Sequence, residues 1–516
     1  MNLPTDDNQH RDLPLWVRIV VPIIFLLATF AYVSTISPTE SYYLLIFAAL
    51  VGGYMAMNIG ANDVANNVGP AVGSQALTLG AAIIIAGIFE ALGALVAGGS
   101  VVGTIKSGII DPSMVPDAQT FIWLMTGALI AGAVWLNFAT WMGAPVSTTH
   151  SIVGGVLGAG IAAGGMDIAN WSKMGAIAAS WVISPVFGGV IAAALLMFIK
   201  KTILYREDIK GAAQIFVPYL VAFMAWAFSS YLILKGMKKI VKVEPLTAFG
   251  MGLIIAIVVF VITAKLIKRS AEKLQNNTNS VNDLFKIPLI FAAALLSFAH
   301  GANDVANAIG PLAAINEALS SGAVASKAGI PIWIMILGAI GIAVGLAVFG
   351  PKLIRTVGGE ITELDKSRAY CIAMAAAITV IIASQLGLPV SSTHIALGGV
   401  FGVGFLREYL KTRYASKLHQ MIEDHEGEDK QKLEQFLNDF QNADIEDMQA
   451  MIKLAKKNPE TVPISKKERK RLNKIYKQEL VKRKHLYRIA AAWVITVPAS
   501  ALIGAMMYFM MRGMLL

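Results

Sequence analysis

Apolar runs recur along the whole chain, separated by short polar stretches. Each run has about 20 residues, which is enough for a helix to cross the ~30 Å hydrocarbon core of a bilayer. The glycine-rich runs 147–165 and 391–406 are predicted either to span the membrane or to re-enter it, and the second is short for a span. The pattern predicts an all-α, polytopic membrane protein with about 12–13 membrane segments, at 16–35, 41–60, 79–100, 121–139, 147–165, 176–199, 213–234, 246–267, 287–311, 331–350, 369–387, 391–406 and 488–511.

Basic residues mark the loops that are predicted to face the cytoplasm under the positive-inside rule. Lys/Arg clusters follow the segments that end near residues 199, 267 and 350, and the largest charged stretch is 407–487. Counting crossings outward from these loops predicts a cytoplasmic N-terminus and an external C-terminus. One loop conflicts with this orientation, because the four lysines within 235–242 would face outward.

The composition agrees with a chain embedded in a membrane. Of the 516 residues, 56% are apolar and 15% are charged, against about 25% charged residues in soluble domains. The net charge is +10, and the stretch 407–488, with 20 Lys/Arg and 14 Asp/Glu, carries +6 of it. These figures exclude a disordered chain and a collagen, and they favour cytoplasmic loop charge over nucleic-acid binding. The single cysteine, Cys371, excludes a disulfide framework and a cysteine metal cluster.

Two polar motifs occur twice, once in each half of the chain. The sequence GANDVAN begins at Gly60 and again at Gly301, while PVSTTH begins at Pro145 and PVSSTH at Pro389. A weaker third pair, AASWVISP and AAAWVITVP, surrounds Trp181 and Trp493. Crossing parity makes the two GANDVAN copies run in opposite directions through the membrane. Such an inverted-topology repeat is typical of secondary transporters whose substrate site lies at the midplane between the halves.

The doubled motifs carry groups that are suited to ion binding. Asp63 and Asp304 lie at the ends of long apolar runs, where an ionised carboxylate is costly and marks a functional site by default. The surrounding Gly, Pro and Asn disfavour a continuous helix, and a broken helix frees carbonyl oxygens for a cation and N–H groups for an anion. A cap or turn would explain one Asn-Asp pair, but two identical copies in opposed halves favour a functional role. The hydroxyls of the second motif either bind ions or pack helices together.

Three further polar residues have two interpretations each. His150 and His394, at the ends of the second motif, are either hydrogen-bonded packing residues or neighbours of the site. Glu90, inside the third segment, is either a coupling acid or the partner of a nearby polar group such as Lys106. The sequence leaves both questions open.

Together, GANDVANN/GANDVANA and PVSTTH/PVSSTH resemble the doubled signature of the inorganic phosphate transporter (PiT) family, the sodium- or proton-coupled phosphate symporters. The resemblance covers approximately 41–406 and 486–511. It implies an inverted-repeat helical transporter fold, phosphate as the substrate and a cation that drives uptake, without a further cofactor and without enzymatic activity. The helix at 16–35 is an addition to the family core, and Ala373 stands where many relatives have a glutamate. The choice between Na⁺ and H⁺ as coupling cation therefore stays open.

The resemblance also implies the residues of the site. Glu90 matches an acidic position of the family and is the candidate coupling acid. A sodium ion is expected at Asp63, Asn66, Asp304 and Asn307. The full set of expected substrate and coupling-ion residues is Asn62, Asp63, Asn66, Ser147, Thr148, Thr149, Asn303, Asp304, Asn307, Ser391, Ser392 and Thr393.

The predicted domain organisation follows the repeats. No small-residue cleavage site follows 16–35, so we expect a retained helix and not a signal peptide. The predicted divisions are 1–40 for this extra transmembrane helix, 41–211 for the first repeat, 212–286 for connecting helices and a cytoplasmic loop, 287–406 for the second repeat, 407–487 for a charged cytoplasmic insert and 488–516 for the final helix that completes the second repeat.

The leading prediction is a multi-pass protein of the cell membrane (the inner membrane in a Gram-negative source) that imports inorganic phosphate by symport with a cation. A sulfate permease of the same family is the closest alternative, but two aspartates able to accept an O–H from phosphate favour phosphate. An anion channel is less favoured, and a membrane enzyme least, since no metal-ligand spacing or nucleophile–base arrangement appears. The expected partners are phosphate, the coupling cation and membrane lipids, without nucleic acid. A homodimer is left open.

Overall fold

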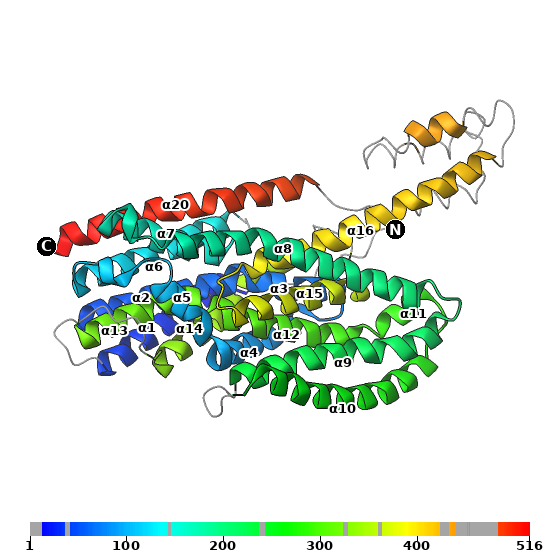
Figure 1. Cartoon of the computed structure of the whole chain (residues 1–516), viewed down its shortest axis with the longest axis horizontal. Coiled ribbons are helices and arrows are strands. Elements are labelled where there is room, and N and C mark those ends of the chain that lie inside the picture. The colour runs from blue at the N-terminus through cyan, green and yellow to red at the C-terminus, as the bar shows by residue number, and fades with distance from the viewer. Residues whose placement is uncertain are drawn as a thin grey trace. The chain divides into compact units, whose positions relative to one another are not determined.

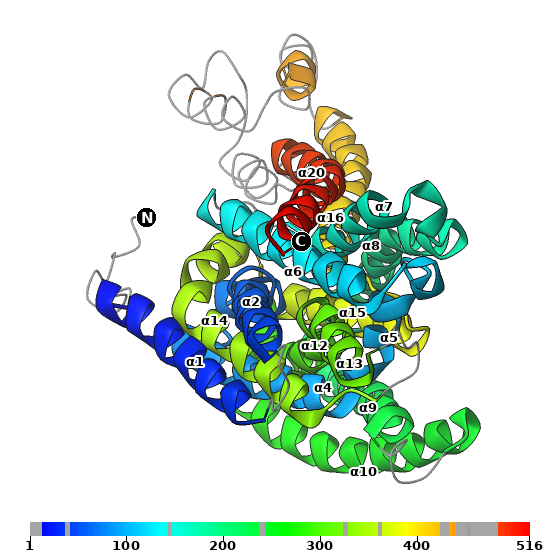
Figure 2. The same cartoon turned by 90° about the vertical axis from the view of Figure 1, so that its left-hand side faces the viewer.

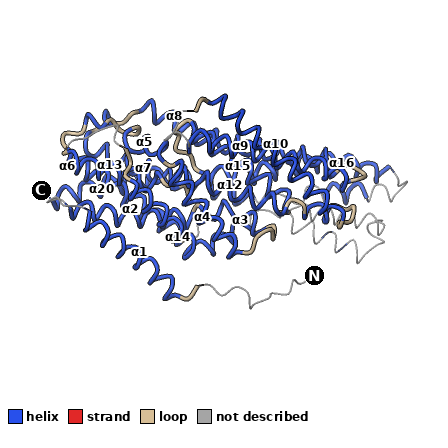
Figure 3. Tube along the Cα trace, turned by 90° about the horizontal axis from the view of Figure 1, so that it is seen from below, coloured by secondary structure: helices blue, strands red, loops and turns tan. Residues whose placement is uncertain are grey.

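The computed structural model describes residues 13–36, 42–142, 146–236, 243–322, 329–359, 364–423, 433–439, 451, 454 and 483–515. Within these residues the chain is helical throughout, apart from loops and one isolated bridge between Ile110 and Ala169 (Figure 3). Eleven helical stretches of the described chain are long and apolar enough to cross a membrane. The prediction of an all-α, polytopic membrane protein is confirmed.

The helices of the first half follow the predicted segments closely. Several begin where a polar side chain just outside the apolar run accepts a backbone N–H; Thr78 caps α4 in this way and Asp117 caps α6. The helices are α1 (Leu15–Ile36), α2 (Tyr42–Asn62), α3 (Val64–Gly73), α4 (Leu79–Ala97), α5 (Gly99–Ser107), α6 (Ala118–Trp141), α7 (Thr148–Gly164), α8 (Trp171–Ile199), α9 (Ile209–Gly236) and α10 (Pro245–Glu272).

In the second half, α12 and α13 form an interrupted pair like α2 and α3, and a separate unit, residues 401–482, precedes the last helix. Helix α16 continues past the predicted membrane segment 391–406 to Glu423. The residues after 406 are charged but rich in good helix formers, so the helix has no reason to end there. The helices are α11 (Thr278–Asp283), α12 (Lys286–Asp304), α13 (Ala306–Ser321), α14 (Ile332–Gly359), α15 (Lys366–Gln385), α16 (Ser392–Glu423) and α20 (Arg483–Leu515). Residues 401–482 form a compact unit of their own.

The two halves are interleaved through glycine contacts. Helix α2 packs on α14, and α12 packs on α4. Each contact places a glycine against a backbone carbonyl of the partner helix: a Cβ on Gly345 would lie 1.9 Å from the Met57 oxygen, and one on Gly93 would lie 2.0 Å from the Phe298 oxygen. Since small residues let membrane helices approach closely, each interrupted helix is held by a helix of the opposite half.

The two halves run in opposite directions through this arrangement. Figures 1 and 3 show α2 and α13 toward one end of the helical body and α3 and α12 nearer its middle. The chain therefore passes from α2 to α3 in one direction and from α12 to α13 in the other. In Figure 2, α1 and α10 lie at the periphery; both expose many apolar side chains, as expected where a helix faces lipid.

The predicted orientation can be checked by cysteine accessibility. In a variant without Cys371, single cysteines at positions 38 and 208 are expected to react with an impermeant thiol reagent from opposite sides of the membrane. The reason is that an odd number of predicted membrane segments lies between the two positions. Labelling from the same side would contradict the predicted topology.

Several positions named in the predictions lie outside the described residues. They are position 38, the lysines at 238, 239 and 242 in the conflicting loop, Pro145, and most of the insert 407–487.

Candidate functional site

The two GANDVAN motifs lie where a membrane-spanning helix is interrupted. Between α2 and α3 the Asn66 N–H bonds to the Asp63 carbonyl (3.0 Å), and between α12 and α13 the Ala308 N–H bonds to the Val305 carbonyl (3.1 Å), both three residues back instead of four. Asn and Asp favour such interruptions because their side chains compete for the backbone. The prediction of broken helices at these motifs is confirmed.

Prolines seven residues after the aspartates free two more carbonyls. Pro70 lies inside α3 and Pro311 inside α13. Because proline has no N–H, the carbonyl four residues earlier loses its helical donor. These carbonyls belong to Asn66 and Asn307, so each asparagine offers backbone as well as side-chain oxygen.

The second motifs form the first turns of α7 and α16. Ser147 accepts the His150 N–H (3.1 Å) and Ser391 accepts the His394 N–H (3.3 Å). Both serines are therefore N-caps. Their capping turns aim the next two hydroxyls of each motif inward, at the N-terminus of a helix, where N–H groups and the helix dipole favour an anion.

Asp63 binds one hydroxyl from each half of the chain. Its Oδ2 accepts from Thr148 (2.6 Å) and its Oδ1 accepts from Thr393 (3.0 Å). The Asn66 amide also donates to the Thr393 hydroxyl (2.9 Å). The carboxylate is 2% exposed, so two hydroxyls hold it inside the protein.

Asp304 repeats this arrangement with the halves exchanged. Its Oδ2 accepts from Ser392 (2.7 Å), and its Oδ1 lies 3.5 Å from the Thr149 hydroxyl. The Asn307 amide donates to Thr149 and also to Thr148, at 3.1 Å each. Thr148 corresponds to Ser392 and Thr149 to Thr393 in the repeat, so the site has approximate two-fold symmetry.

Two buried amide oxygens complete the symmetric site. Asn66 and Asn307 are each 1% exposed, and neither side-chain oxygen has a hydrogen-bond donor among the described residues. An unpaired buried oxygen is costly unless something binds it. Carboxylate, amide and backbone oxygens are the ligands that hard cations prefer.

The first asparagine of each motif lies at the edge of the site. Asn62 donates to the Thr140 hydroxyl (2.9 Å), and Asn303 hydrogen-bonds the Ser384 hydroxyl (2.9 Å). Thr140 belongs to α6, which packs against α2, and Ser384 belongs to α15, which packs against α12. Ser147 and Ser391 cap the helices, and in the flipped orientation of its amide Asn303 also donates to Asp304 Oδ1 (3.0 Å). The side chains that surround the two carboxylates are those of Asn66, Thr148, Thr149, Asn307, Ser392 and Thr393.

A polar cluster adjoins Asp304 and has no counterpart at Asp63. His300 Nε2 lies 2.8 Å from Asp304 Oδ2, and its Nδ1 lies 2.6 Å from Glu90 Oε2. Asn67 donates to Glu90 Oε1 (2.8 Å). Of the two interpretations of Glu90, pairing with a nearby polar group agrees with these contacts, but the partners are His300 and Asn67. Lys106, the example considered, forms an ion pair with Glu317 on α13.

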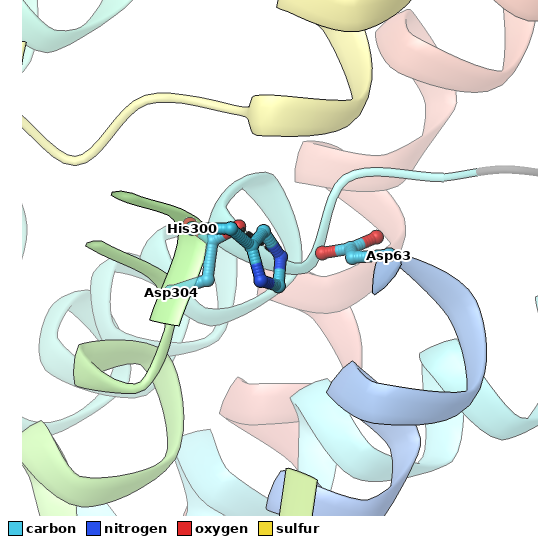
Figure 4. Close-up of side chains that lie close together, drawn as sticks. All are labelled: Asp63, His300 and Asp304. Atoms are coloured by element: carbon cyan, nitrogen blue, oxygen red, sulfur yellow. Dashed lines mark ion pairs between the residues drawn. The ribbon is translucent and has the colours of Figure 1, made fainter. Parts of the chain in front are cut away.

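His300 and Asn67 are the site residues that sequence reasoning missed. The two copies of the motif differ at these positions: the repeat offset matches His300 with Ile59 and Asn67 with Ala308. A histidine four residues before Asp304 lies on the same helix face, and this spacing was the available signal. Figure 4 shows its ring between the two aspartates. One ligand atom from each of the three residues lies within 4.8 Å of the others.

Comparison with known proteins agrees with this geometry. Residues 59–504 match the profile of the phosphate transporter family. A protein of Helicobacter pylori (strain J99), named as a candidate phosphate permease, is 52% identical over 503 residues, covering 95% of this chain and 94% of the relative. A similarly named protein of Pyrococcus furiosus is 40% identical over 366 residues, covering 70% of this chain and 88% of the relative. A solved structure titled "The sodium-dependent phosphate transporter" has a TM-score of 0.74 and 31% identity, covering 91% of this chain and 99% of that one.

Proposed function

The chain belongs to the phosphate transporter family, and on that premise we propose that it imports inorganic phosphate across the cell membrane by symport with sodium. One observation carries the cation part of the proposal: the paired oxygens of Asp63, Asn66, Asp304 and Asn307 converge, and two of them are buried without a donor. The 31% identical structure named as sodium-dependent supports sodium as the cation.

The phosphate part rests on the two helix N-termini. The first turns of α7 and α16 bring N–H groups and the hydroxyls of Thr148, Thr149, Ser392 and Thr393 to the same region. Hydroxyl and amide donors suit the oxygens of a tetrahedral anion. The site contains no lysine or arginine among the described residues that line it, so the positive charge that an anion needs comes from a bound cation or from a protonated His300 beside Asp304.

Charge explains why the two substrates would move together. A phosphate about 5 Å from a carboxylate is repelled by roughly 3 kcal/mol per unit charge at an effective dielectric constant of 20. A sodium ion between them turns this repulsion into attraction. Each ligand therefore raises the affinity of the other by the same factor, and the empty and fully loaded carriers are the favoured states.

The deciding experiment measures radiolabelled phosphate uptake into proteoliposomes with sodium and pH gradients imposed separately. We expect uptake to follow an inward sodium gradient and to persist without a pH gradient, with little competition by sulfate. Uptake driven only by pH would assign the proton as coupling ion. Strong sulfate competition would favour a sulfate permease, and flux that follows voltage alone would favour a channel.

Proton coupling is the second candidate, because Glu90, His300 and Asp304 form a continuous buried chain. Replacing Glu90 with Gln leaves His300 with one carboxylate partner, and breaking such a buried pair costs about 3–5 kcal/mol. We expect Glu90→Gln to slow uptake at least tenfold and to change its pH dependence. The matched control is Glu317→Gln, which breaks another buried pair away from the site. Equal effects of both variants on the pH profile would argue against Glu90 as the coupling acid.

The insert 407–487 is expected to be dispensable for transport. It lies outside both repeats and holds none of the doubled residues, and the Pyrococcus furiosus relative aligns with only 70% of this chain. A variant in which a short flexible linker joins residues 406 and 486 should insert into the membrane and retain sodium-dependent uptake. Loss of uptake at normal membrane abundance would show that the insert takes part in transport.

A further inference from the structure

Four rings stack in a row beside the two hydroxyl motifs. The ring centroid of His150 lies 3.9 Å from that of Trp181, and His394 lies 3.7 Å from Trp493. The two imidazoles meet edge to face at 4.5 Å. We call these four residues the ring column. It contains the third repeated motif, which the proposed transport cycle does not otherwise use.

In the ring column the two imidazoles make ring–ring packing contacts. His150 and His394 are 4% and 0% exposed, and their ring nitrogens have no side-chain hydrogen-bond partner among the described residues; the backbone of Trp493 lies within hydrogen-bonding reach of His150. Each imidazole contacts a ring on two sides: His150 lies between Trp181 and His394, and His394 lies between His150 and Trp493. Offset and edge-to-face contacts between aromatic rings fix the distance and tilt of their backbones.

The ring column is attached to both substrate-binding turns. The backbone N–H of each histidine is bound by the N-cap serine of its own turn. The Trp181 indole of the first half donates to the Pro389 carbonyl of the second (3.1 Å), and the neighbouring Val390 carbonyl accepts from Thr149 (3.0 Å). The turn before α16 is thus held by two residues of the opposite half.

We propose that the ring column is a positioning element that sets the separation between the first turns of α7 and α16, so that hydroxyls from both turns act on one tetrahedral oxyanion. This inference rests on the proposed function. The rings do not touch the anion; they place the residues that do. Removing a ring lets the turns shift, and a misplacement of about 1 Å costs up to 100-fold where geometry decides binding.

The test compares ring removal with ring retention. His150→Ala and His394→Ala delete a ring, whereas His150→Phe and His394→Phe keep a ring and delete the nitrogens. We expect the alanine variants to raise the KM for phosphate at least about tenfold and the phenylalanine variants to stay within threefold of wild type. The sodium activation constant should change less than twofold in all four. The ratio of phosphate to arsenate uptake should fall in the alanine variants only.

A matched tryptophan pair controls for the loss of a large side chain. Trp181→Ala should behave like the histidine-to-alanine variants. Trp226→Ala should leave the KM unchanged, although Trp226 is also half-buried and also donates its indole N–H to a backbone carbonyl, that of Phe249 (3.0 Å). Binding of radiolabelled phosphate by the purified variants gives the same comparison without transport.

The outcomes separate this inference from the proposed function. Wild-type protein without sodium-dependent phosphate uptake would refute the proposed function. Given wild-type uptake, phenylalanine variants as defective as the alanine variants would show that the nitrogens matter and would overturn the positioning role. So would alanine variants whose folded yield falls while the KM of the remaining protein is unchanged.

Discussion

Replacing Asp63 or Asp304 with Asn is expected to abolish sodium-coupled phosphate uptake while the protein still reaches the membrane. Asparagine keeps the size of the side chain, and its single amide oxygen can still accept one hydroxyl bond, from Thr148 or Thr393 at position 63 or from Ser392 at position 304. It removes the negative charge. At an effective dielectric constant of 20, a charge about 3 Å from a cation contributes roughly 5 kcal/mol, which corresponds to more than a thousandfold in sodium affinity.

The sodium dependence should therefore change more than phosphate recognition does. The carboxylates repel the anion, so their loss does not weaken phosphate binding directly; it removes the cation that brings the anion in. Uptake measured over a range of sodium concentrations, with phosphate binding measured at high sodium, distinguishes the two effects. Asp117→Asn is the control, because asparagine caps a helix as well as aspartate does. Wild-type uptake rates in both site variants would contradict this prediction and would show that the two aspartates act only as structural caps.

Replacing Gly345 with Ala is expected to prevent most of the protein from folding, although the residue lies outside both motifs. The added methyl group would meet the Met57 carbonyl oxygen at 1.9 Å. The methyl carbon is bonded directly to the backbone of α14, and the oxygen belongs to the backbone of α2. Neither atom can move aside by itself, so the two helices have to separate. Overpacking typically costs about 1–3 kcal/mol and occasionally more, and a contact this short with rigid backbone belongs at the upper end, a large share of a marginal stability.

The matched control for this variant is Gly80→Ala in α4, where no atom beyond the chain neighbours and the adjoining helix backbone lies within 4 Å of the added methyl group. Alanine favours a helix over glycine by about 1 kcal/mol, so this variant should be as stable as wild type or more so. Thermal melting of the detergent-purified proteins, followed by size-exclusion chromatography, gives both values. Equal melting temperatures would show that the helix contact adjusts at low cost.

The sequence predicts the membrane segments and the paired motifs because both are local or repeated signals. An apolar run of a given length shows a span directly, and two copies of GANDVAN reveal a site that one copy would not. The repeat also predicts that the motifs meet. It does not predict how they meet: the exchange of partners, in which Asp63 bonds Thr393 and Asp304 faces Thr149, depends on interleaved helices far apart in the chain.

The errors and omissions have the same physical origin. Lys106 lies near Glu90 in sequence, but α5 places it against Glu317, more than two hundred residues away. His300 looked like an ordinary residue before the motif until the fold brought Glu90 to its other side. Helix α16 extends beyond the predicted membrane segment 391–406 because hydropathy indicates where an apolar run ends and not where a helix ends.

The cluster of Asn67, Glu90 and His300 has a consequence for the energies of the transport cycle. In the repeat, Asn67 corresponds to Ala308 and His300 corresponds to Ile59. Glu90 corresponds to Ile342, because Gly301 packs against the backbone of Glu90 and Gly60 packs in the same way against the backbone of Ile342. In an inverted-repeat carrier, the inward-open and outward-open forms arise when the two repeats exchange conformations. Identical repeats would make these forms degenerate. Here a polar network lies at one of these positions and apolar residues at the related position, so we expect the two forms of the unloaded protein to differ in energy.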